Sequence, residues 1–215
     1  MATNKLQIWN VALSAHLGAG KLANTTTPSP QQEQCVLHYD DTVRALLEAH
    51  WWTWARARTT LTAEATNDRS NEWAYKYRMP GDVLAIRWIN EPQTARALMA
   101  ANRNPDTPRE LYGDHVYSDV QSAVMEYTAL VEDVSVWPQI FADAVAAALA
   151  ARMAMPLTEN ARLRRDALQM AEMELERAIV HDEAMQSGME QDLKATWLDE
   201  RGTDGLDYPP VLGAT

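Results

Sequence analysis

The fold of this chain is decided by the segment Tyr39-Asp40-Asp41-Thr42-Val43-Arg44-Ala45-Leu46-Leu47-Glu48-Ala49-His50-Trp51-Trp52-Thr53-Trp54-Ala55-Arg56-Ala57-Arg58. It places three of the chain's eight tryptophans within four positions, at the end of an amphipathic helical pattern. No catalytic or ligand-binding scheme requires such a cluster. A joint at which a helix gives way to a sheet does require large apolar side chains to fill it.

We interpret the cluster as a structural hinge between helix and sheet, made of six aromatic residues: Trp51, Trp52, Trp54, Trp73, Tyr75 and Tyr77. The alternative is a stacking platform for sugars or bases. Platforms that bind single strands come with a basic groove, whereas this chain carries a formal net charge of -11. Packing is therefore the favoured interpretation.

The composition sets the class of protein. A length of 215 residues with 47% apolar residues suits one large domain, or one domain with an appendage. The net charge of -11 argues against a protein that coats nucleic acid, because such proteins neutralise phosphates with Lys and Arg. It is compatible with a protein past which nucleic acid moves without sticking.

Compartment and membrane signals are weak. The longest apolar run, residues 140–155, is interrupted by Asp143 and Arg152, and we expect it to be too short and too Ala-rich to span a membrane. The first residues lack a secretory apolar region, and Cys35 is the single cysteine, which excludes an internal disulfide. We expect a cytoplasmically assembled protein with no membrane partner.

The periodicity predicts an α+β fold that is mostly helical, with a helical bundle, a small antiparallel sheet and an extended C-terminal arm. Predicted helices cover residues 4–18, 29–58, 138–155 and 158–186, and Gly18 and Gly20 are expected to end the first of them. Ser29, Pro30 and Gln32 form a capping-box signal for the second helix. Thr158 is the expected cap of the fourth helix, which we expect to end near Gly188.

The region 60–131 is predicted to form the sheet. Alternating patterns predict strands at residues 60–65, 73–78, 84–88 and 124–131, and a tight hairpin turns at Gly113-Asp114. Residues 90–108 form an insertion with a possible short helix at 94–101. The predicted domain covers 1–187 and the arm covers 188–215.

A search for chemistry finds no strong motif. The five histidines have no metal-ligand spacing, and Asp40, Asp41 and Glu48 are acids on one helix face, which is typical of a solvated surface. Cys35 falls on an apolar stripe, so a buried structural thiol is the favoured interpretation. We expect no catalytic residue, cofactor or metal.

The C-terminal arm has too few apolar residues for a core of its own but carries spaced anchors, namely Trp197, Leu198, Tyr208, Val211 and Leu212. Such a segment either orders on a partner or is a frayed terminus. Both interpretations stay open from composition alone.

Several segments in one order resemble the tail tubular protein A family, the head-to-tail adaptor (connector) proteins of short-tailed bacteriophages. The similarity lies within residues 6–165. It is carried by Ile8-Trp9-Asn10-Val11-Ala12-Leu13 with Leu17-Gly18, by Cys35-x-x-x-Tyr39-x-x-x-x-Arg44-x-Leu46-Leu47 followed by Trp52, Ala55 and Arg58, by Trp73-Ala74-Tyr75-x-Tyr77-x-x-Pro80-x-Asp82-x-Leu84, and by Asp133-x-Ser135-x-Trp137-Pro138-x-x-Phe141 followed by residues 144–154 and Leu157-Thr158.

The resemblance implies a structural virion protein of the neck and tail. It implies a homo-oligomeric ring of twelve subunits that joins the portal protein to the tail nozzle protein and extends the channel for genome DNA ejection, without specific DNA binding. The C-terminal anchors named above would then contact the portal. Two alternatives remain: a phage-associated cell-wall hydrolase using Glu48 with Asp40 or Asp41, and a non-viral protein-interaction module using the aromatic face.

Overall fold

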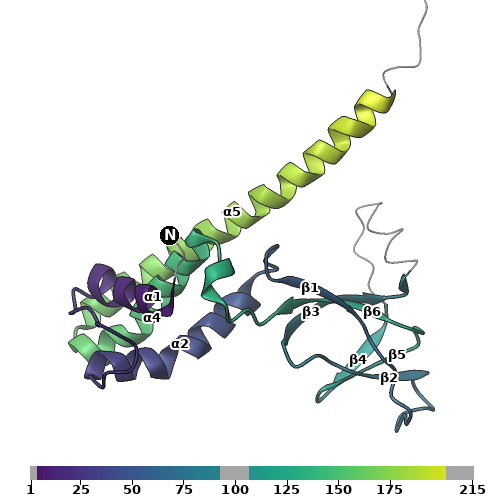
Figure 1. Cartoon of the computed structure of the whole chain (residues 1–215), viewed down its shortest axis with the longest axis horizontal. Helices are drawn as coiled ribbons and strands as arrows, with labels where there is room; N and C mark the ends of the chain where they lie inside the picture. The colour runs from purple at the N-terminus through teal and green to yellow at the C-terminus, as the bar shows by residue number, and fades with distance from the viewer. Residues whose placement is uncertain (1–3, 93–106, 202–215) are drawn as a thin grey trace, which may run out of the picture. The chain divides into compact units, whose positions relative to one another are not determined.

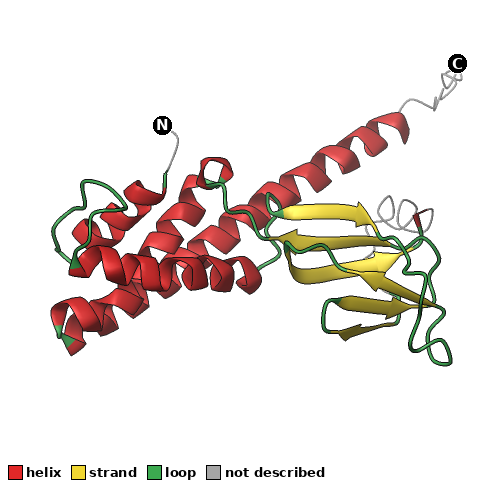
Figure 2. Ribbon diagram, turned by 60° about the horizontal axis from the view of Figure 1, so that its bottom comes forward, coloured by secondary structure: helices red, strands yellow, loops and turns green. Residues whose placement is uncertain are grey.

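The computed structural model describes residues 4–92 and 107–201, with side chains described up to residue 185. The chain is α+β: helices and two small antiparallel sheets gather in separate regions (Figures 1 and 2). It divides into two compact units, Met1–Ile179 and Val180–Thr215. The predicted helix at 94–101 lies outside the described residues.

The predicted first helix is present, but its last turn is wider than expected. Helix α1 (Lys5–Val11) begins at Asn4, whose side chain accepts from the Gln7 amide, and continues as the π-helix η1 (Ala12–His16). Gly18 adopts a φ of 64°, which lets the Ala19 amide donate to the Leu13 carbonyl at 2.8 Å. The glycine therefore ends the helix, as the sequence indicated.

Helix α2 (Pro30–Ala49) begins where the sequence predicts. The Ser29 hydroxyl accepts from the Gln32 amide at 3.1 Å, and Pro30 occupies the first helical position. The reciprocal half of the predicted capping box is wrong, because the Gln32 side chain donates to the Thr25 carbonyl at 3.1 Å instead. That bond ties the preceding loop to the start of the helix.

The predicted continuation of this helix to residue 58 is wrong. His50 is extended, with φ −147° and ψ 157°, and residues 56–60 form a strand. The indole nitrogen of Trp52 donates to the Leu46 carbonyl at 2.8 Å. Carbonyls of the last helical turn lack an intrahelical donor, so this side chain stabilises the helix end at Ala49.

Helix α4 (Gln139–Thr158) lies at the centre of the helical core. Its alanines let α1 and α2 approach it closely, and the contacts are with both of those helices. Buried residues from it include Phe141, Val145, Leu149 and Met153. Among the described residues, α4 alone has the length and hydropathy of a membrane span, a test that a buried core helix also passes.

Helix α5 (Ala161–Arg201) differs from the prediction at both ends. Thr158 belongs to α4, and Glu159 follows it in the left-handed region at φ 51°. The Asn160 side chain accepts from the amides of Arg162 and Leu163, so it is the cap. Gly188 does not end the helix, so residues 189–201 of the predicted extended arm are helical.

Within the described residues, six strands form two three-stranded antiparallel sheets, ordered β1-β6-β3 and β2-β5-β4. Their bounds are β1 Arg56–Thr60, β2 Tyr75–Arg78, β3 Val83–Asn90, β4 Arg109–Tyr112, β5 His115–Ser118 and β6 Val124–Ala129. The first strand therefore precedes the predicted one at 60–65, of which Ala63 keeps a single bridge to Tyr77. The hairpin at Gly113-Asp114 is confirmed, with Gly113 at φ 61°.

The two sheets share a core that is distinct from the helical one. Tyr77 and Val116 come from the second sheet, and Ile89, Met125 and Tyr127 come from the first. Helical side chains form a separate buried cluster around α4. The residues that connect these two cores therefore determine how the helices are attached to the sheets.

The cap of α2 offers a local test of the helix start. Ser29→Ala should lower the free energy of unfolding by about 1 kcal/mol, because the Gln32 amide loses its acceptor. Ser29→Thr, which keeps the hydroxyl, should retain most of that stability. Urea unfolding measures both, and equal stability of the alanine variant and the natural protein would contradict the cap.

Candidate functional site

The tryptophan-rich segment ends in an aromatic cluster that we call the aromatic joint, consisting of Trp52, Trp54, Trp137 and Phe141. Phe141 is its centre: its ring centroid lies 4.9 Å from that of Trp52, 4.8 Å from that of Trp54 and 5.2 Å from that of Trp137, each in an edge-on arrangement. Such edge-to-face pairs add stability beyond the burial of area. The joint thus locks the segment after α2 onto the first turn of α4.

Polar bonds continue the joint into the first sheet. Arg87 of β3 is buried, and its guanidinium donates to the Trp52 carbonyl at 2.6 Å and to the Thr128 hydroxyl at 3.5 Å. The indole of Trp137 donates to the Val131 carbonyl at 3.0 Å. A buried guanidinium is tolerated only where acceptors surround it, so these bonds fix the helices to the sheet.

The structure does not bring all six predicted hinge residues together. Trp52 and Trp54 lie in the helical core, whereas Tyr75 and Tyr77 belong to the core between the sheets. Trp51 is 49% exposed.

Trp73 precedes β2 and donates its indole hydrogen to Glu110 at 3.1 Å. Sequence reasoning did not assign Trp137 and Phe141 to the joint, although their i, i+4 spacing at a helix start was a usable signal.

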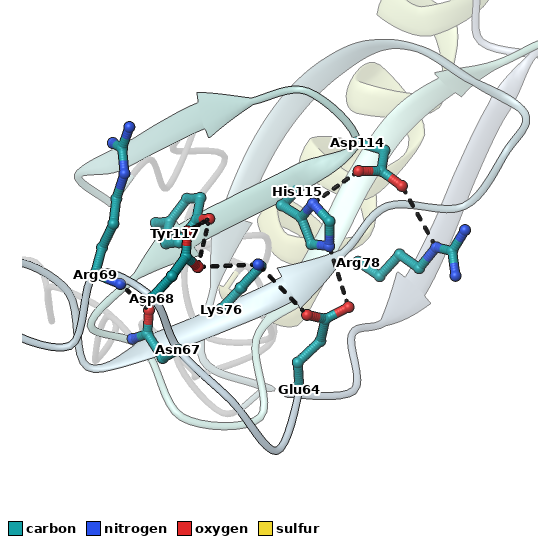
Figure 3. A network of polar contacts seen from close by, with 9 residues as sticks. All are labelled: Glu64, Asn67, Asp68, Arg69, Lys76, Arg78, Asp114, His115 and Tyr117. Atoms are coloured by element: carbon teal, nitrogen blue, oxygen red, sulfur yellow. Dashed lines mark hydrogen bonds and ion pairs between the residues drawn. The ribbon is translucent and has the colours of Figure 1, made fainter.

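A second feature, invisible in the sequence, is a polar network over the second sheet (Figure 3). Lys76 donates to Asp68 at 2.9 Å and lies 3.7 Å from Glu64. The Tyr117 hydroxyl donates to Asp68 at 3.0 Å. Arg69 pairs with Glu110 and lies over the ring of Tyr117 at 5.2 Å.

Hydrogen bonds in this network stabilise the ionised form of the Asp68 carboxylate. The hydrogen bond from Lys76 is the largest cause that lowers its pKa to about 2, with the Tyr117 hydroxyl adding to the effect. Both donors favour the ionised form. Since Asp68 belongs to the loop before β2 and its donors are on β2 and β5, the network ties that loop to the sheet.

His115 lies between two carboxylates in the same network. Its Nε2 is 3.1 Å from Glu64 Oε1, and its Nδ1 is 2.7 Å from Asp114 Oδ1. Each ring nitrogen of His115 therefore faces one carboxylate oxygen, the first from the segment between β1 and β2 and the second from the preceding residue. The charged groups of this surface contact one another directly, whereas general acid–base catalysis needs an acid and a base that face a cleft.

A cavity of about 340 Å³ lies beside helix α2, lined by Lys5, Tyr39, Asp40, Val43, Arg44, Leu130, Glu132, Val134 and Trp137. The Tyr39 ring is 95% buried, and Lys5 Nζ lies 4.3 Å from its centroid. Burial raises the pKa of Tyr39, with the charge of Asp40 adding to the effect. The cavity has the size of a small-ligand site, but its charged rim holds both signs.

Of the three acids weighed for catalysis, Asp40 lines the cavity beside α2, whereas Asp41 and Glu48 do not. Asp40, Asp41 and Glu48 are exposed on α2, and Asp40 lies 3.5 Å from Lys5. Cys35 is fully buried, with its sulfur 3.6 Å from that of Met153, and burial raises the pKa of its thiol to about 12. The expected burial of Cys35 is confirmed. Within residues 4–92 and 107–185, no three metal-ligating side chains cluster.

The predicted portal-contacting residues lie outside the part of the chain whose side chains are described. Trp197 and Leu198 are in α5, but their side chains are not described, and Tyr208, Val211 and Leu212 lie beyond the described residues.

Comparison with known proteins gives no family. No family model matches the chain, and no curated protein matches it significantly.

The joint predicts a sharp difference between two adjacent tryptophans. Trp52→Ala should lower the free energy of unfolding by about 3–5 kcal/mol, because a buried ring and the bond to Leu46 are both lost. The half-exposed Trp51→Ala should cost less than about 1 kcal/mol. Equal losses in urea unfolding would show that the joint is not where we place it.

The network predicts a pH dependence. The pKa of Asp68 in the folded protein, about 2, is below its ordinary 3.8, so its stabilising effect is complete above about pH 4 and is lost as the pH falls towards 2. Asp68→Asn should therefore reduce the fall in unfolding free energy between about pH 5 and about pH 2.5.

Asp41→Asn is the matched control, since Asp41 is exposed on α2, away from the network. The same fall in all three proteins would contradict the assigned pairing of Asp68 with Lys76.

Proposed function

We propose that this chain is a head-to-tail adaptor of a short-tailed bacteriophage, a virion protein that joins the portal to the tail nozzle. In this proposal twelve copies form a ring, each contributing a helical bundle and a sheet, and the genome passes through the ring. The proposal rests on the ordered resemblance within residues 6–165 and on the surface of α5.

The exposed apolar side chains along α5 are the observation that carries the proposal. Five large apolar side chains along this helix are between 38% and 62% exposed: Leu168, Met170, Met173, Val180 and Met185. Large apolar surface left in water marks sites of protein association. Contacts that differ on the two sides of a subunit close into a ring when the rotation fits, which gives these residues a partner in the neighbouring copy.

The joint supports the same role mechanically. A ring subunit must keep the surfaces that bind its partners at fixed positions. Buried contacts of Arg87 and Phe141 attach the segment around Trp52 to the first sheet and to the helical core. The net charge of -11 also suits a channel subunit, because an acidic wall repels phosphates and lets DNA slide.

The C-terminal segment supplies the proposed contact with the portal. Its anchors Trp197, Leu198, Tyr208, Val211 and Leu212 are spaced within a sequence that has few other apolar residues. Segments of this composition gain affinity by filling pockets on a partner as they order. The portal contact therefore belongs to residues outside the first compact unit, Met1–Ile179.

Co-sedimentation with purified portal rings tests both parts of the proposal. The full chain should sediment with the rings, and removal of residues 189–215 should weaken that binding about tenfold or more while the circular dichroism of the helices and sheets is kept. Removal of residues 202–215 alone distinguishes the contribution of the helical residues 189–201 to binding from that of the last anchors, Tyr208, Val211 and Leu212.

Two outcomes of this experiment count against the proposal. A full chain that never sediments with portal rings would contradict the adaptor role. A truncated chain that binds as well as the full one would contradict only the role of the C-terminal segment.

A further inference from the structure

A groove with an unusual charge lies on the helical side of the first unit. It has a volume of about 430 Å³ and is formed by residues of α2, α4 and the start of α5: His38, Ala151, Arg152, Met155, Arg164 and Leu168. We call it the basic groove. It is separate from the aromatic joint, the polar network and the cavity beside Tyr39.

The charge of the groove runs against that of the whole chain. Its lining holds two arginines and a histidine but no carboxylate, in a protein whose formal net charge is -11. Neither Arg152 nor Arg164 has an ion pair or hydrogen bond from its side chain to the described residues. Elsewhere the described cations are often paired, as Lys76 is with Asp68 and Arg58 with Glu126.

The same groove exposes apolar surface between its cations. Met155 is 42% exposed and Leu168 is 43% exposed. A surface that combines unpaired guanidinium groups with apolar side chains is suited to a ligand that carries carboxylates and apolar side chains together.

We propose that the basic groove binds an acidic amphipathic segment of a partner protein, with carboxylates at Arg152 and Arg164 and an apolar side chain against Met155 and Leu168. Guanidinium groups pair with carboxylates in a two-pronged geometry that favours this class of ligand. A nucleic acid fits less well, since its affinity comes from many phosphate contacts and the lining of the groove supplies only two arginines. The inference does not depend on the adaptor role, because it is argued from the charge and exposure of the groove lining alone.

Fluorescence anisotropy with the full chain tests the proposal. The probe is a labelled synthetic peptide of about 18 residues with Glu and Leu at helical spacing, and it is compared with a peptide of the same composition in scrambled order. The natural protein should bind the amphipathic peptide more tightly than the scrambled one. Arg152→Glu with Arg164→Glu should weaken binding about tenfold or more, because the two positive charges that pair with the peptide carboxylates become negative.

The matched control reverses the same number of charges on α5 outside the groove. Arg162→Glu with Arg165→Glu should change affinity by less than about threefold, since both residues are exposed and neither lines the groove. Leu168→Ser should weaken binding while leaving the charges intact. Circular dichroism of each variant separates lost binding from lost folding, and Arg152→Ala with Arg164→Ala replaces the reversed pair if that variant does not fold.

Three results would overturn the proposal. One is that the amphipathic peptide does not bind the natural protein. Another is that the groove and control variants lose affinity equally. The third is that a single-stranded oligonucleotide of similar length binds the groove more tightly than the peptide does, which would assign it to nucleic acid.

Discussion

The structure depends on the way in which helix α2 is stopped. The amphipathic pattern before the tryptophans favours continued helix, but the Trp52 indole donates to the Leu46 carbonyl and the chain turns extended at His50. The carbonyl of Trp52 then accepts from buried Arg87 on β3, so one residue contacts both the helix it ends and the sheet that follows. Phe141 fills the space beneath this turn. If the helix ran on, residues 56–60 would have no strand to contribute against β6.

The aromatic joint connects two cores that differ in residue composition. The helical core is built around alanines of α4, which permit close helix approach, and the core between the sheets is built from tyrosines, branched residues and Met125. On the outer side of the second sheet, ion pairs around Asp68 and His115 hold the loop before β2. A chain held together in this way is suited to keep partners at fixed positions, which is what the adaptor proposal requires. Its exposed features include the apolar side chains along α5 and the basic groove.

The sequence predicted what is decided locally. Ser29 at the start of α2, Gly18 after the first helix and Gly113 in the hairpin each act within a few residues, and each was correctly placed. The end of α2 was predicted wrongly because the Leu46 carbonyl is capped by the indole of Trp52, six residues later, and the backbone carbonyl of Trp52 is in turn held by Arg87. The first strand was displaced because its position depends on pairing with β6, more than sixty residues later in the chain. Gly188 did not end α5, since one glycine costs a helix only about 1 kcal/mol. The polar network joins residues from loops and strands far apart in sequence, and no local pattern announces it.

The central claim is that this chain is a ring-forming adaptor between portal and tail. Electron microscopy of the full chain mixed with portal rings tests it most directly, because ring formation and recruitment appear in the same image. The account predicts an added closed ring, coaxial with the portal, whose subunits each have helices and a small pair of sheets. Portal rings without added density, beside unassembled copies of this chain at saturating concentration, would contradict it.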